Sequence, residues 1–413
     1  MLGGAPLPMA PPHNSEADAA APETHAGLGE VPVLLIIRGV TALLVVVSLV
    51  IAAHYYLGVR MFDASGLPAP IVSALWVAMW GAFLSILVGG IGGRFLPRRL
   101  TLVPTWVGFL WMGAFGLLLV TALASDVLVA LLSLVLERKP EWRQLQALGI
   151  PLLVGPVFLL GFRAARGTPR VEKLTVPVKG LGKELDGFRI VQITDIHIGE
   201  TLRREHMQRI VDVVNGLNAD AVAVTGDLID GTPSRLAHDI EPLGELEGKH
   251  GVYFVTGNHE YYHGGPAWER HVARLGLTVL HNEHRVVESG ASKLVIGGVP
   301  DLEAGNFLPD HAPDARKAFE GAPEGAPRVL LAHQPRFARK AQGLDIQLQL
   351  SGHTHGGQIF PFMFFVRLQQ PVIAGFRVLW GVPVYTSKGT GYWGPPVRVG
   401  TSCEVTEITL RAA

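Results

Sequence analysis

Four long apolar runs dominate the first 165 residues of this 413-residue chain, at about 33–53, 70–91, 102–124 and 145–162. A helix of about 20 apolar residues is long enough to cross the hydrocarbon core of a bilayer. The same 165 residues hold only nine Lys and Arg and eight Asp and Glu, and the runs show no polar face. A water-soluble helical bundle would need such a face. The runs therefore predict a multi-pass transmembrane helical region over residues 31–165, with about four spans.

The segments that flank these runs predict a topology. Residues 1–30 are rich in Ala, Pro, Gly and acidic groups and lack a hydrophobic period, which predicts a disordered tail. Basic residues gather after the second run and after the last, at Arg94, Arg98 and Arg99 and at Arg163, Arg166, Arg170 and Lys173. Because positively charged loops stay in the cytoplasm, four spans with both ends cytoplasmic are favoured. We expect a cell-membrane protein whose C-terminal domain faces the cytoplasm.

Asp126 leaves alternatives open. It interrupts the apolar stretch from 102 to 136, so residues 127–136 could form a fifth element, and a fifth span would place the C-terminal domain outside. An intramembrane carboxylate can also be functional. Because Arg38 is the only other ionisable group in the runs, a carboxylate at a helix end near the interface is the favoured interpretation.

Charge and cysteine counts exclude several classes of partner and site. The chain has 35 Lys and Arg against 35 Asp and Glu, so no overall basic field indicates a nucleic-acid polymer as a partner. Its one cysteine, Cys403, excludes an internal disulfide framework and a thiolate-rich metal site. Residues 166–413 hold 13 of the 16 histidines. We therefore expect this second part to be a water-exposed domain that carries the chemistry.

Five short apolar runs in this domain end in polar residues of the kind that bind metals. They are IVQITD at Asp195, AVAVTGD at Asp227, VYFVTGNH at Asn258 and His259, VLLAH at His333, and LQLSGHTH at His353 and His355. We interpret the runs as buried strands, and we interpret residues 203–217 as an amphipathic helix. Side chains at the carboxyl ends of adjacent strands converge at one edge of a sheet, where open α/β folds place their sites.

The residue types at these strand ends indicate a metal centre. Carboxylate, imidazole and amide groups are present without a thiolate, at Asp195, His197, Asp227, Asn258, His333, His353 and His355. Seven ligands are too many for one tetrahedral ion, but two ions that share a carboxylate could use them together with water. Mn, Fe, Zn or similar divalent ions suit this set, and affinity order does not choose among them. Paired metals are a recurring device for phosphoester hydrolysis, because they neutralise phosphate oxygens and lower the pKa of bound water.

The motifs resemble those of the calcineurin-like metallophosphoesterases. In order along the chain they are D-I-H (195–197), G-D-L-I-D (226–230), G-N-H-E (257–260), L-A-H-Q-P around His333, and G-H-T-H-G-G-Q (352–358). The resemblance covers about residues 171–413. The extended last motif and the later P-P-V-R-V-G-T-S are similar to a membrane-associated bacterial subgroup. The resemblance implies an α/β domain over residues 166–413, built from two packed mixed β-sheets flanked by helices.

The resemblance also implies roles for individual residues. It assigns Asp195, His197 and His355 to a first metal, Asn258, His333 and His353 to a second, and Asp227 to a bridging position between them. His259 is expected near the leaving group as proton donor or charge stabiliser, and Asp230 as the carboxylate that orients it. Glu260 is expected to support these groups or to hold a turn, and Gln358 to lie near the pocket rim.

The remaining predictions concern seven histidines outside the motifs and one apolar run. The histidines outside the motifs are expected at surface or turn positions, namely His206, His238, His250, His271, His281, His284 and His311. The apolar run 360–366 could be a core strand. It also lies beside the expected site in a chain tethered to a bilayer, so it could instead be an exposed lip that dips into lipid.

The expected function is hydrolysis of a phosphodiester or phosphomonoester by metal-bound hydroxide, on a membrane-associated or lipid-linked substrate. The expected partners are thus the lipid bilayer and a phosphoester, and the expected cofactors are two divalent metal ions. Two alternatives remain. The enzyme could act on soluble cyclic nucleotides or phosphoproteins, or the domain could bind a ligand without catalysis as a membrane sensor.

Overall fold

The computed structural model describes residues 33–90, 92, 95–137 and 139–413. The predicted disordered tail, residues 1–30, and Arg94 of the first basic cluster lie outside the described residues. The chain divides after Ala53 into two compact units, and each is described by itself. In the first unit, helix α1 (Val33–Gly58) begins and exposes Leu43, Leu44 and Leu49 along its length.

The second unit begins with the end of α1, which continues as a π-helical turn (Val59–Asp63), and then contains α2 (Ala69–Gly90), α3 (Arg98–Leu132) and α4 (Glu141–Arg166). Together with α1, these are four helices whose length and apolar composition suffice to cross a membrane. Their positions match the four predicted runs. The fifth element that residues 127–136 could have formed is not present in the described structure, because α3 continues without a break through Asp126 to Leu132.

Asp126 lies in a polar cluster between these helices. Its carboxylate accepts hydrogen bonds from the Tyr56 hydroxyl at 2.8 Å, from Arg60 Nε at 3.0 Å and from Gln146 Nε2 at 3.0 Å. Arg60 and Asp126 form an ion pair. Asp126 lies within the last two turns of α3, but the absence of an ionisable neighbour, on which its interpretation rested, is wrong. Arg60 follows the first apolar run and was therefore not counted within it. In the structure Arg60 lies in the π-helical turn after α1, and its side chain contacts Asp126.

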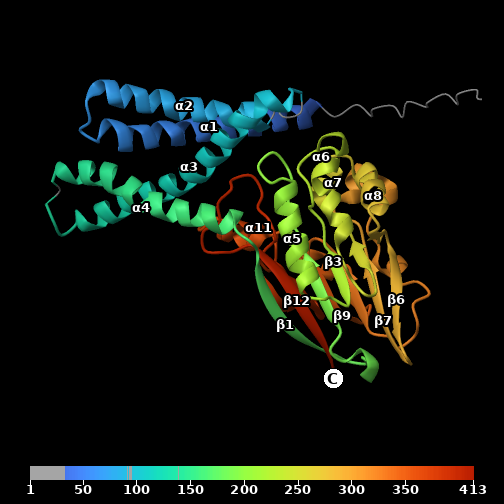
Figure 1. Cartoon of the computed structure of the whole chain (residues 1–413). Coiled ribbons are helices and arrows are strands. Elements are labelled where there is room, and N and C mark those ends of the chain that lie inside the picture. Colours follow the sequence, from blue (N-terminus) through green and yellow to red (C-terminus); the bar gives the residue numbers. More distant parts are fainter. Residues whose placement is uncertain (1–32, 91, 93–94, 138) are drawn as a thin grey trace, which may run out of the picture. The chain divides into compact units, whose positions relative to one another are not determined.

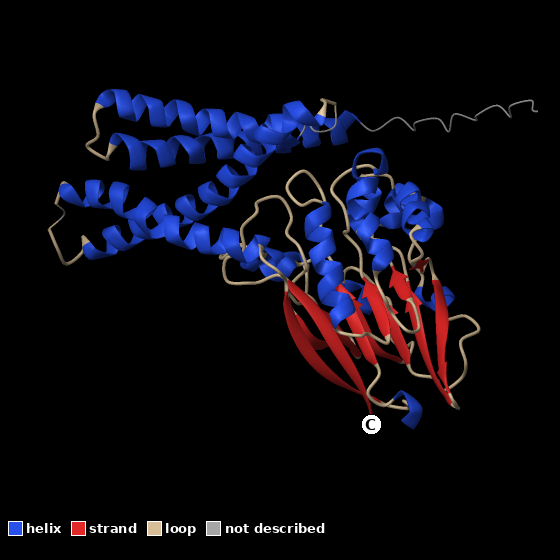
Figure 2. Cartoon of the chain, viewed as in Figure 1, coloured by secondary structure: helices blue, strands red, loops and turns tan. Residues whose placement is uncertain are grey.

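The rest of the chain folds as two mixed β-sheets with helices on their outer faces, which confirms the predicted fold class (Figures 1 and 2). The first sheet has the order β1-β12-β2-β3-β4-β5, with bounds Arg170–Val178, Glu404–Ala412, Arg189–Ile193, Ala221–Val224, Val252–Phe254 and Thr278–Val279. The second has the order β10-β11-β9-β8-β7-β6, with bounds Gly375–Leu379, Val382–Thr386, Ile346–Ser351, Arg328–Leu331, Ser292–Gly298 and Glu283–Ser289. Strands β2, β3 and β4 are mutually parallel, and so are β7, β8 and β9.

Alternation along the strands explains how the layers pack. In β3, Ala221 and Ala223 face the second sheet, where they join one apolar cluster with residues such as Leu331 of β8. Val222 and Val224 face the opposite side and pack against the outer helices. Successive side chains of a strand point to opposite faces, so an unbroken apolar strand such as this one is buried on both sides. Packing on both faces holds the strands in place, and the loops that follow the strands carry the polar groups.

Three helices cover the outer face of the first sheet. They are α5 (Arg204–Gly216), α6 (Pro233–Ile240) and α8 (Gly265–Arg274). The predicted helix at 203–217 is confirmed as α5, whose buried face includes Met207, Ile210 and Val214. Shorter helical segments complete the domain: α7 (Asn258–Tyr262), α9 (Ala304–Phe307), α10 (Ala315–Ala318) and α11 (Met363–Gln369).

The apolar run 360–366 is not a core strand. It leads into helix α11, and its aromatic side chains are exposed: Phe364 is 58% and Phe365 65% accessible. Consecutive apolar residues do not distinguish a buried strand from a short helix, and base rates of burial favoured the strand. The exposed alternative is the one that the structure adopts.

Candidate metal centre

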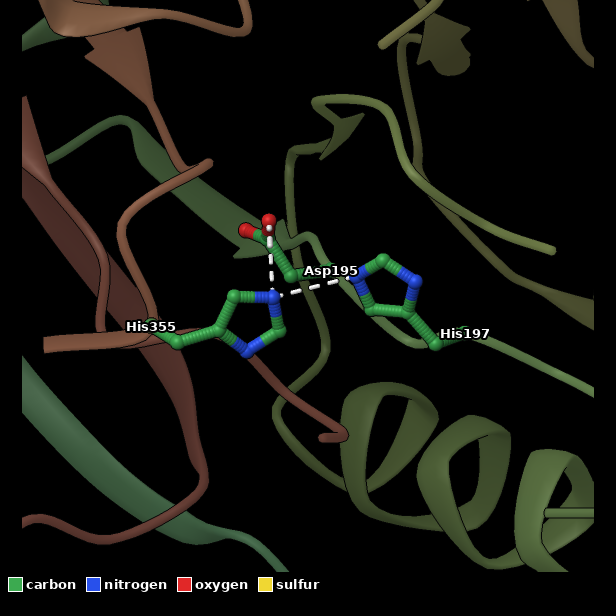
Figure 3. A group of neighbouring side chains, drawn as sticks. All are labelled: Asp195, His197 and His355. Atoms are coloured by element: carbon green, nitrogen blue, oxygen red, sulfur yellow. Dashed lines mark hydrogen bonds and ion pairs between the residues drawn. The ribbon is translucent and has the colours of Figure 1, made fainter. Parts of the chain in front are cut away.

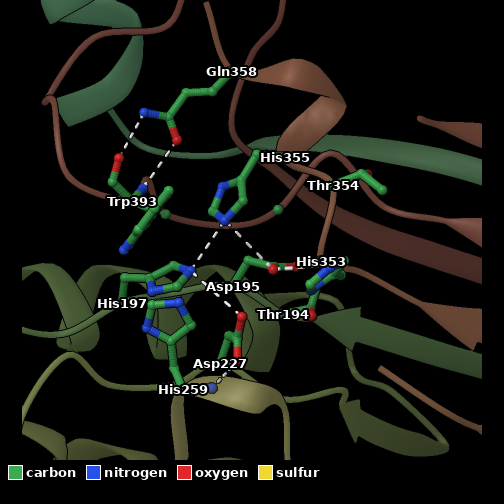
Figure 4. Close-up of polar contacts among 12 residues, drawn as sticks. Thr194, Asp195, His197, Asp227, His259, His353, Thr354, His355, Gln358 and Trp393 are labelled. Atoms are coloured by element: carbon green, nitrogen blue, oxygen red, sulfur yellow. Dashed lines mark hydrogen bonds and ion pairs between the residues drawn. The ribbon is translucent and has the colours of Figure 1, made fainter. Parts of the chain in front are cut away.

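The predicted ligands all lie in the segments that follow strands, as expected, with Asn258 at the start of helix α7 and His355 in a 3-10 turn. Asp195 and His197 follow β2, Asp227 follows β3, and Asn258 follows β4. In the second sheet, His333 follows β8, and His353 and His355 follow β9. The two sheets bring these loops together at their carboxyl edges, so residues up to 160 positions apart in sequence become neighbours (Figure 4).

The backbone at these positions is strained. Five predicted ligands have positive φ, at 53° for Asp195, 55° for His197, 54° for Asp227, 72° for His353 and 51° for His355. Residues other than glycine seldom adopt this left-handed backbone region, and each such residue costs on the order of 1 kcal/mol or more of conformational free energy. Such strain persists where the surrounding structure holds it in place, and it clusters at functional sites.

Two glycines permit the close approach of the loops. A Cβ atom at Gly257 would lie 2.2 Å from Asp227 Oδ1, and one at Gly352 would lie 2.1 Å from Asp195 Oδ2. Neither distance is compatible with a side chain. These glycines therefore let the two carboxylates reach the interior of the site.

Asp195, His197 and His355 form a first group (Figure 3). The Nε2 atoms of His197 and His355 lie 3.0 Å apart, and His355 Nε2 lies 3.5 Å from Asp195 Oδ1. Two imidazole nitrogens and a carboxylate oxygen thus converge on one point. This is the set that the sequence assigned to the first metal.

Asp227, His333 and His353 form a second group. His333 Nε2 lies 3.0 Å from Asp227 Oδ2 and 3.2 Å from His353 Nδ1. The Asp227 carboxylate also lies 3.9 Å from His197 Nε2 of the first group. Asp227 is therefore the carboxylate that adjoins both groups, which is the position expected of a bridging ligand.

Asp230 fixes the orientation of two histidines. Its Oδ1 atom lies 2.9 Å from His197 Nδ1 and 2.7 Å from His259 Nδ1. An ionised carboxylate only accepts hydrogen bonds, so both Nδ1 atoms carry the proton. His197 therefore directs a free Nε2 toward the first group, in the manner of a carboxylate-oriented metal ligand. His259 stands beside that group, with its ring centre 4.6 Å from that of His197.

Burial and neighbouring charges have opposite effects on the pKa values of Asp227 and His333. Burial alone would raise the pKa of Asp227, but the His333 and His259 imidazoles hold it well below its usual range. Burial would lower the pKa of His333, but Asp227 raises it well above the ordinary value. By contrast, burial and the nearby His333 lower the pKa of His353 to about 3. His333 is thus held as the cation beside Asp227, whereas His353 is held as a neutral imidazole.

The groups present fit a bound metal. Asn258 is 6% exposed, and its Oδ1 atom finds no hydrogen-bond partner among the described residues. An orphaned buried amide oxygen is rare, and a cation is a natural partner for it. Imidazole and carboxylate donors without a thiolate suit Mn²⁺, Fe²⁺ or Zn²⁺. His333 donates its Nδ1–H to the Thr225 carbonyl at 2.7 Å, which leaves Nε2 directed into the site.

Glu260 and Gln358 take supporting positions. The Glu260 carboxylate accepts hydrogen bonds from the backbone N–H groups of Asp227, Leu228 and Gly257 at 2.6–3.0 Å. It therefore holds two ligand loops together as a buried turn carboxylate. Gln358 exchanges hydrogen bonds with the backbone of Trp393 at 2.8 and 3.0 Å and lines the cavity next to the metal-binding groups.

Arg398 is a site residue that sequence reasoning missed. The side chain is buried, donates to the carbonyls of Gly391 and His355, and places Nη2 3.2 Å from His355 Nδ1. Burial, His197 and this guanidinium hold the pKa of His355 well below its usual value. Arg398 is the arginine of the P-P-V-R-V-G-T-S motif, so the sequence pointed to the segment that contains it. Its contact with His355 depends on the fold and could not be predicted from that motif.

A cavity of about 560 Å³ opens over the centre. One part of its wall is formed by polar residues of the two groups, including His259 and Asn258. The other part is apolar and is formed by Phe362 and Val366 of the 360–369 segment and by Met112 of helix α3. Met112 could not be predicted as a lining residue, since nothing in an apolar run distinguishes one methionine from its neighbours.

The segment beside the cavity also packs on the apolar helices. A Cβ atom at Gly116 of α3 would lie 3.3 Å from the Phe362 ring. Ile359 and Val397 join an apolar cluster with residues of α3 and α4, such as Leu117 and Val154. The rim of the cavity is therefore continuous with the helices that are apolar enough for a membrane.

Comparison with known proteins gives matches along this domain. A sequence profile described as calcineurin-like phosphoesterase matches residues 188–357. A zebrafish (Danio rerio) protein named transmembrane protein with metallophosphoesterase domain is 40% identical over 270 residues, 63% of this chain and 62% of that protein. An uncharacterized metallophosphoesterase of Helicobacter pylori is 35% identical over 276 residues, 66% of this chain and 72% of that protein. One of Aquifex aeolicus is 31% identical over 244 residues, 59% of this chain and 92% of that protein. The chain thus spans less than two thirds of the length of the zebrafish relative.

Proposed function

Because this chain belongs to the calcineurin-like metallophosphoesterase family, we propose that it is a membrane-bound, metal-dependent hydrolase of phosphoesters. The observation that carries the proposal is the convergence of two ligand groups on the shared carboxylate of Asp227. The unpaired amide oxygen of Asn258 supports it, because that atom lines the same cavity as the ligand groups and can accept a cation.

In this proposal the centre holds two divalent ions. Asp195, His197 and His355 would hold the first, Asn258, His333 and His353 would hold the second, and Asp227 would contribute to both. Such ions neutralise phosphate oxygens and lower the pKa of water near neutral pH. The chain supplies the geometry, since the strained loops and their glycines fix the ligands before the substrate arrives.

His259 and Asp230 act on the leaving group. Asp230 accepts the Nδ1–H of His259 at 2.7 Å, so the opposite nitrogen, Nε2, is the one that can face a substrate. Burial opposes protonation of His259, but Asp227 and Asp230 raise its pKa to about 9. The Asp230 carboxylate, which is not assigned to either ion, favours the protonated imidazole, and that imidazole can donate a proton to the departing oxygen.

The proposed substrate is an amphiphilic phosphoester, such as a lipid-linked diester. The cavity joins the ligand groups to an apolar wall that includes Met112 of α3 and Phe362. A phosphate flanked by an apolar chain would place the phosphate at the ligands and the chain along this wall. The exposed rings of Phe364 and Phe365 continue the apolar surface outside the cavity, where they can enter a bilayer.

We further propose that residues 31–165 form the multi-pass membrane region and residues 166–413 the catalytic domain, which faces the cytoplasm. Four apolar helices and the basic residues Arg98, Arg99, Arg163 and Arg166 support this orientation. A reporter fused after Ala413 should behave as cytoplasmic. Digestion of residues 166–413 by protease added to intact cells stripped of their outer envelope would contradict this orientation.

The function is tested with the full chain in lipid nanodiscs. Two nitrophenyl phosphodiesters with the same leaving group are compared, one with a methyl substituent and one with a long alkyl chain. We expect metal-dependent turnover of both, with kcat/KM at least tenfold higher for the alkyl ester, since each buried methylene contributes about 0.8 kcal/mol. Equal kcat/KM values would favour soluble substrates. Absence of turnover in a chain loaded with two metals would favour a ligand-binding sensor.

A further inference from the structure

A third cluster of metal-binding side chains lies in the domain, apart from the two groups described above. It consists of Glu269 of α8, His281 in the loop after β5, and His311 in the short helical turn Pro309–His311. Their ligand atoms lie within 4.8 Å of one another. All three residues are partly buried, and the two histidines lie at a loop and a turn, as the sequence predicted, but the fold brings them together.

The three side chains converge on a single carboxylate oxygen. Glu269 Oε1 lies 3.1 Å from His281 Nδ1 and 3.8 Å from His311 Nδ1. Ligands of a tetrahedral zinc ion lie about 2.0–2.2 Å from the metal, which places them about 3.3 Å from one another. The observed spacing is therefore close to that of a metal site and needs only small side-chain rotations.

An ion pair between Glu269 and His281 leaves His311 as a neutral imidazole close to the same carboxylate oxygen. The two imidazole rings are perpendicular to each other with centres 4.3 Å apart, so two imidazolium ions would repel each other while they share one carboxylate. The protonation of the pair is accordingly divided: Glu269 raises the pKa of His281, whereas burial lowers the pKa of His311. A divalent cation could replace the proton on His281 and take both imidazoles and the carboxylate as ligands at the same time.

We propose that Glu269, His281 and His311 form a separate site for a divalent transition-metal ion of the zinc type. Two imidazoles and one carboxylate are donors that zinc commonly takes, with water as a further ligand. The ion would join three segments that are distant in sequence: helix α8, the loop after β5 and the turn before α10. Its role is structural, because it ties these segments together at the edge of the first sheet.

The site also adjoins the catalytic loop. The Tyr261 hydroxyl lies 2.9 Å from His311 Nδ1, and Tyr261 belongs to α7, the helix that begins with Asn258 and His259. An ion that binds His311 would compete with this hydrogen bond or take up the phenol oxygen as a neighbour. Occupancy of the site should therefore affect the stability of α7, although no residue of the site belongs to the proposed metal centre.

The test measures zinc bound to the full chain, purified in detergent with a tag that contains no histidine. After the chain is loaded with zinc and desalted, the Glu269→Gln/His281→Gln variant should hold one equivalent less than the unmutated chain. The matched control is His238→Gln/His250→Gln, which removes two histidines outside every cluster and should hold the same amount as the unmutated chain. Zinc should also raise the Tm of the Asp227→Asn chain, but not that of a chain carrying Asp227→Asn together with Glu269→Gln/His281→Gln.

A ligand-conserving variant separates metal binding from a structural ion pair. Glu269→His removes the carboxylate but supplies a third imidazole, so it should retain the equivalent of zinc that Glu269→Gln loses. Loss of zinc in both variants, or equal zinc in the unmutated chain and in Glu269→Gln/His281→Gln, would overturn the proposal. If Glu269→Gln/His281→Gln fails to fold, the Glu269→His variant still decides the question. Zinc retained by Glu269→His supports the site, and zinc lost from Glu269→His contradicts it. The outcome does not depend on phosphoesterase activity.

Discussion

Two of the polar clusters in the described part of the chain are centred on aspartate carboxylates, and they differ in the groups that surround those carboxylates. In the helical region, the Asp126 carboxylate faces one cation, Arg60, and two neutral donors, Tyr56 and Gln146. In the phosphoesterase domain, the Asp227 and Asp195 carboxylates are crowded by imidazoles, several of which can only be neutral. The Asp126 carboxylate is therefore paired with a cation, although Gln146 Oε1 has no hydrogen-bond partner among the described residues. In the metal centre, burial lowers the pKa values of His353 and His355, so these two imidazoles stay neutral beside the carboxylates.

The backbones of the two clusters differ in the same sense. The residues around Asp126 lie in regular helices, and their side chains reach one another without distortion. The ligands of the metal centre sit on left-handed backbone at five positions. An ion pair on regular backbone stabilises the fold, while neutral imidazoles gathered around carboxylates on strained backbone indicate a bound cation. This comparison predicts opposite consequences for carboxylate substitutions in the two regions.

The largest effect is expected for Asp227→Asn. The amide keeps the size of the side chain but removes the charge that adjoins both ligand groups, so turnover of a phosphodiester should be abolished and the centre should hold less than one ion. Activity assays and elemental analysis of the purified full chain measure both. Normal turnover with two tightly held ions would show that Asp227 is not the shared ligand.

His259→Ala should give the next largest effect. His259 is hydrogen-bonded to Asp230 and is not assigned to either ion, so the variant should keep its metal content and lose about 10²–10⁴-fold in kcat, the usual scale for a positioned proton donor. The loss should be smaller for nitrophenyl esters than for alkyl esters, because nitrophenolate leaves without protonation. Equal losses for the two kinds of leaving group would exclude this role.

Phe364→Ser with Phe365→Ser should give a moderate and selective effect. Both rings are exposed and lie outside the cavity, and burial of two phenylalanine side chains in lipid contributes roughly 3–6 kcal/mol before ordering costs. Turnover of the long-chain diester in nanodiscs should fall several-fold, with the methyl diester unchanged. An equal fall for both esters would indicate damage to the site rather than loss of contact with lipid.

Asp126→Asn should have the smallest effect on catalysis and act on stability alone. Removal of the charge leaves Arg60 unpaired, which should destabilise the helical region by about 1–3 kcal/mol, less than for a fully buried pair because both side chains are partly accessible. Thermal unfolding in detergent measures this loss. Metal content and kcat of the folded fraction should be unaltered. A large fall in kcat would mean that the cluster is functional rather than structural.

The residues that could be predicted from the sequence are those whose role is local. Asp195, Asp227 and His333 follow buried strands, and parallel strands bring their ends together, so the pattern alone placed them at one edge. The assignment of Asp195 and His333 to different ions needed the resemblance to a family, because residue types do not state which ligand faces which ion.

The residues that could not be predicted depend on contacts between distant segments. Arg60 reaches Asp126 across 66 positions, and Arg398 reaches His355 across 43. Met112 lines the cavity only because α3 lies beside it. Hydrophobic periodicity describes which face of an element is buried but not which partner it meets. The same limit explains why His281 and His311 showed no signal of a common site.

The most direct test of the central claim is an anomalous difference map from crystals of the metal-loaded chain, recorded at the absorption edge of the metal that supports turnover. We predict two peaks about 3.5–4 Å apart, with the Asp227 carboxylate between them. One should lie against Asp195, His197 and His355, and the other against Asn258, His333 and His353. A single peak, or peaks away from these residues in a chain that hydrolyses phosphodiesters, would contradict the account.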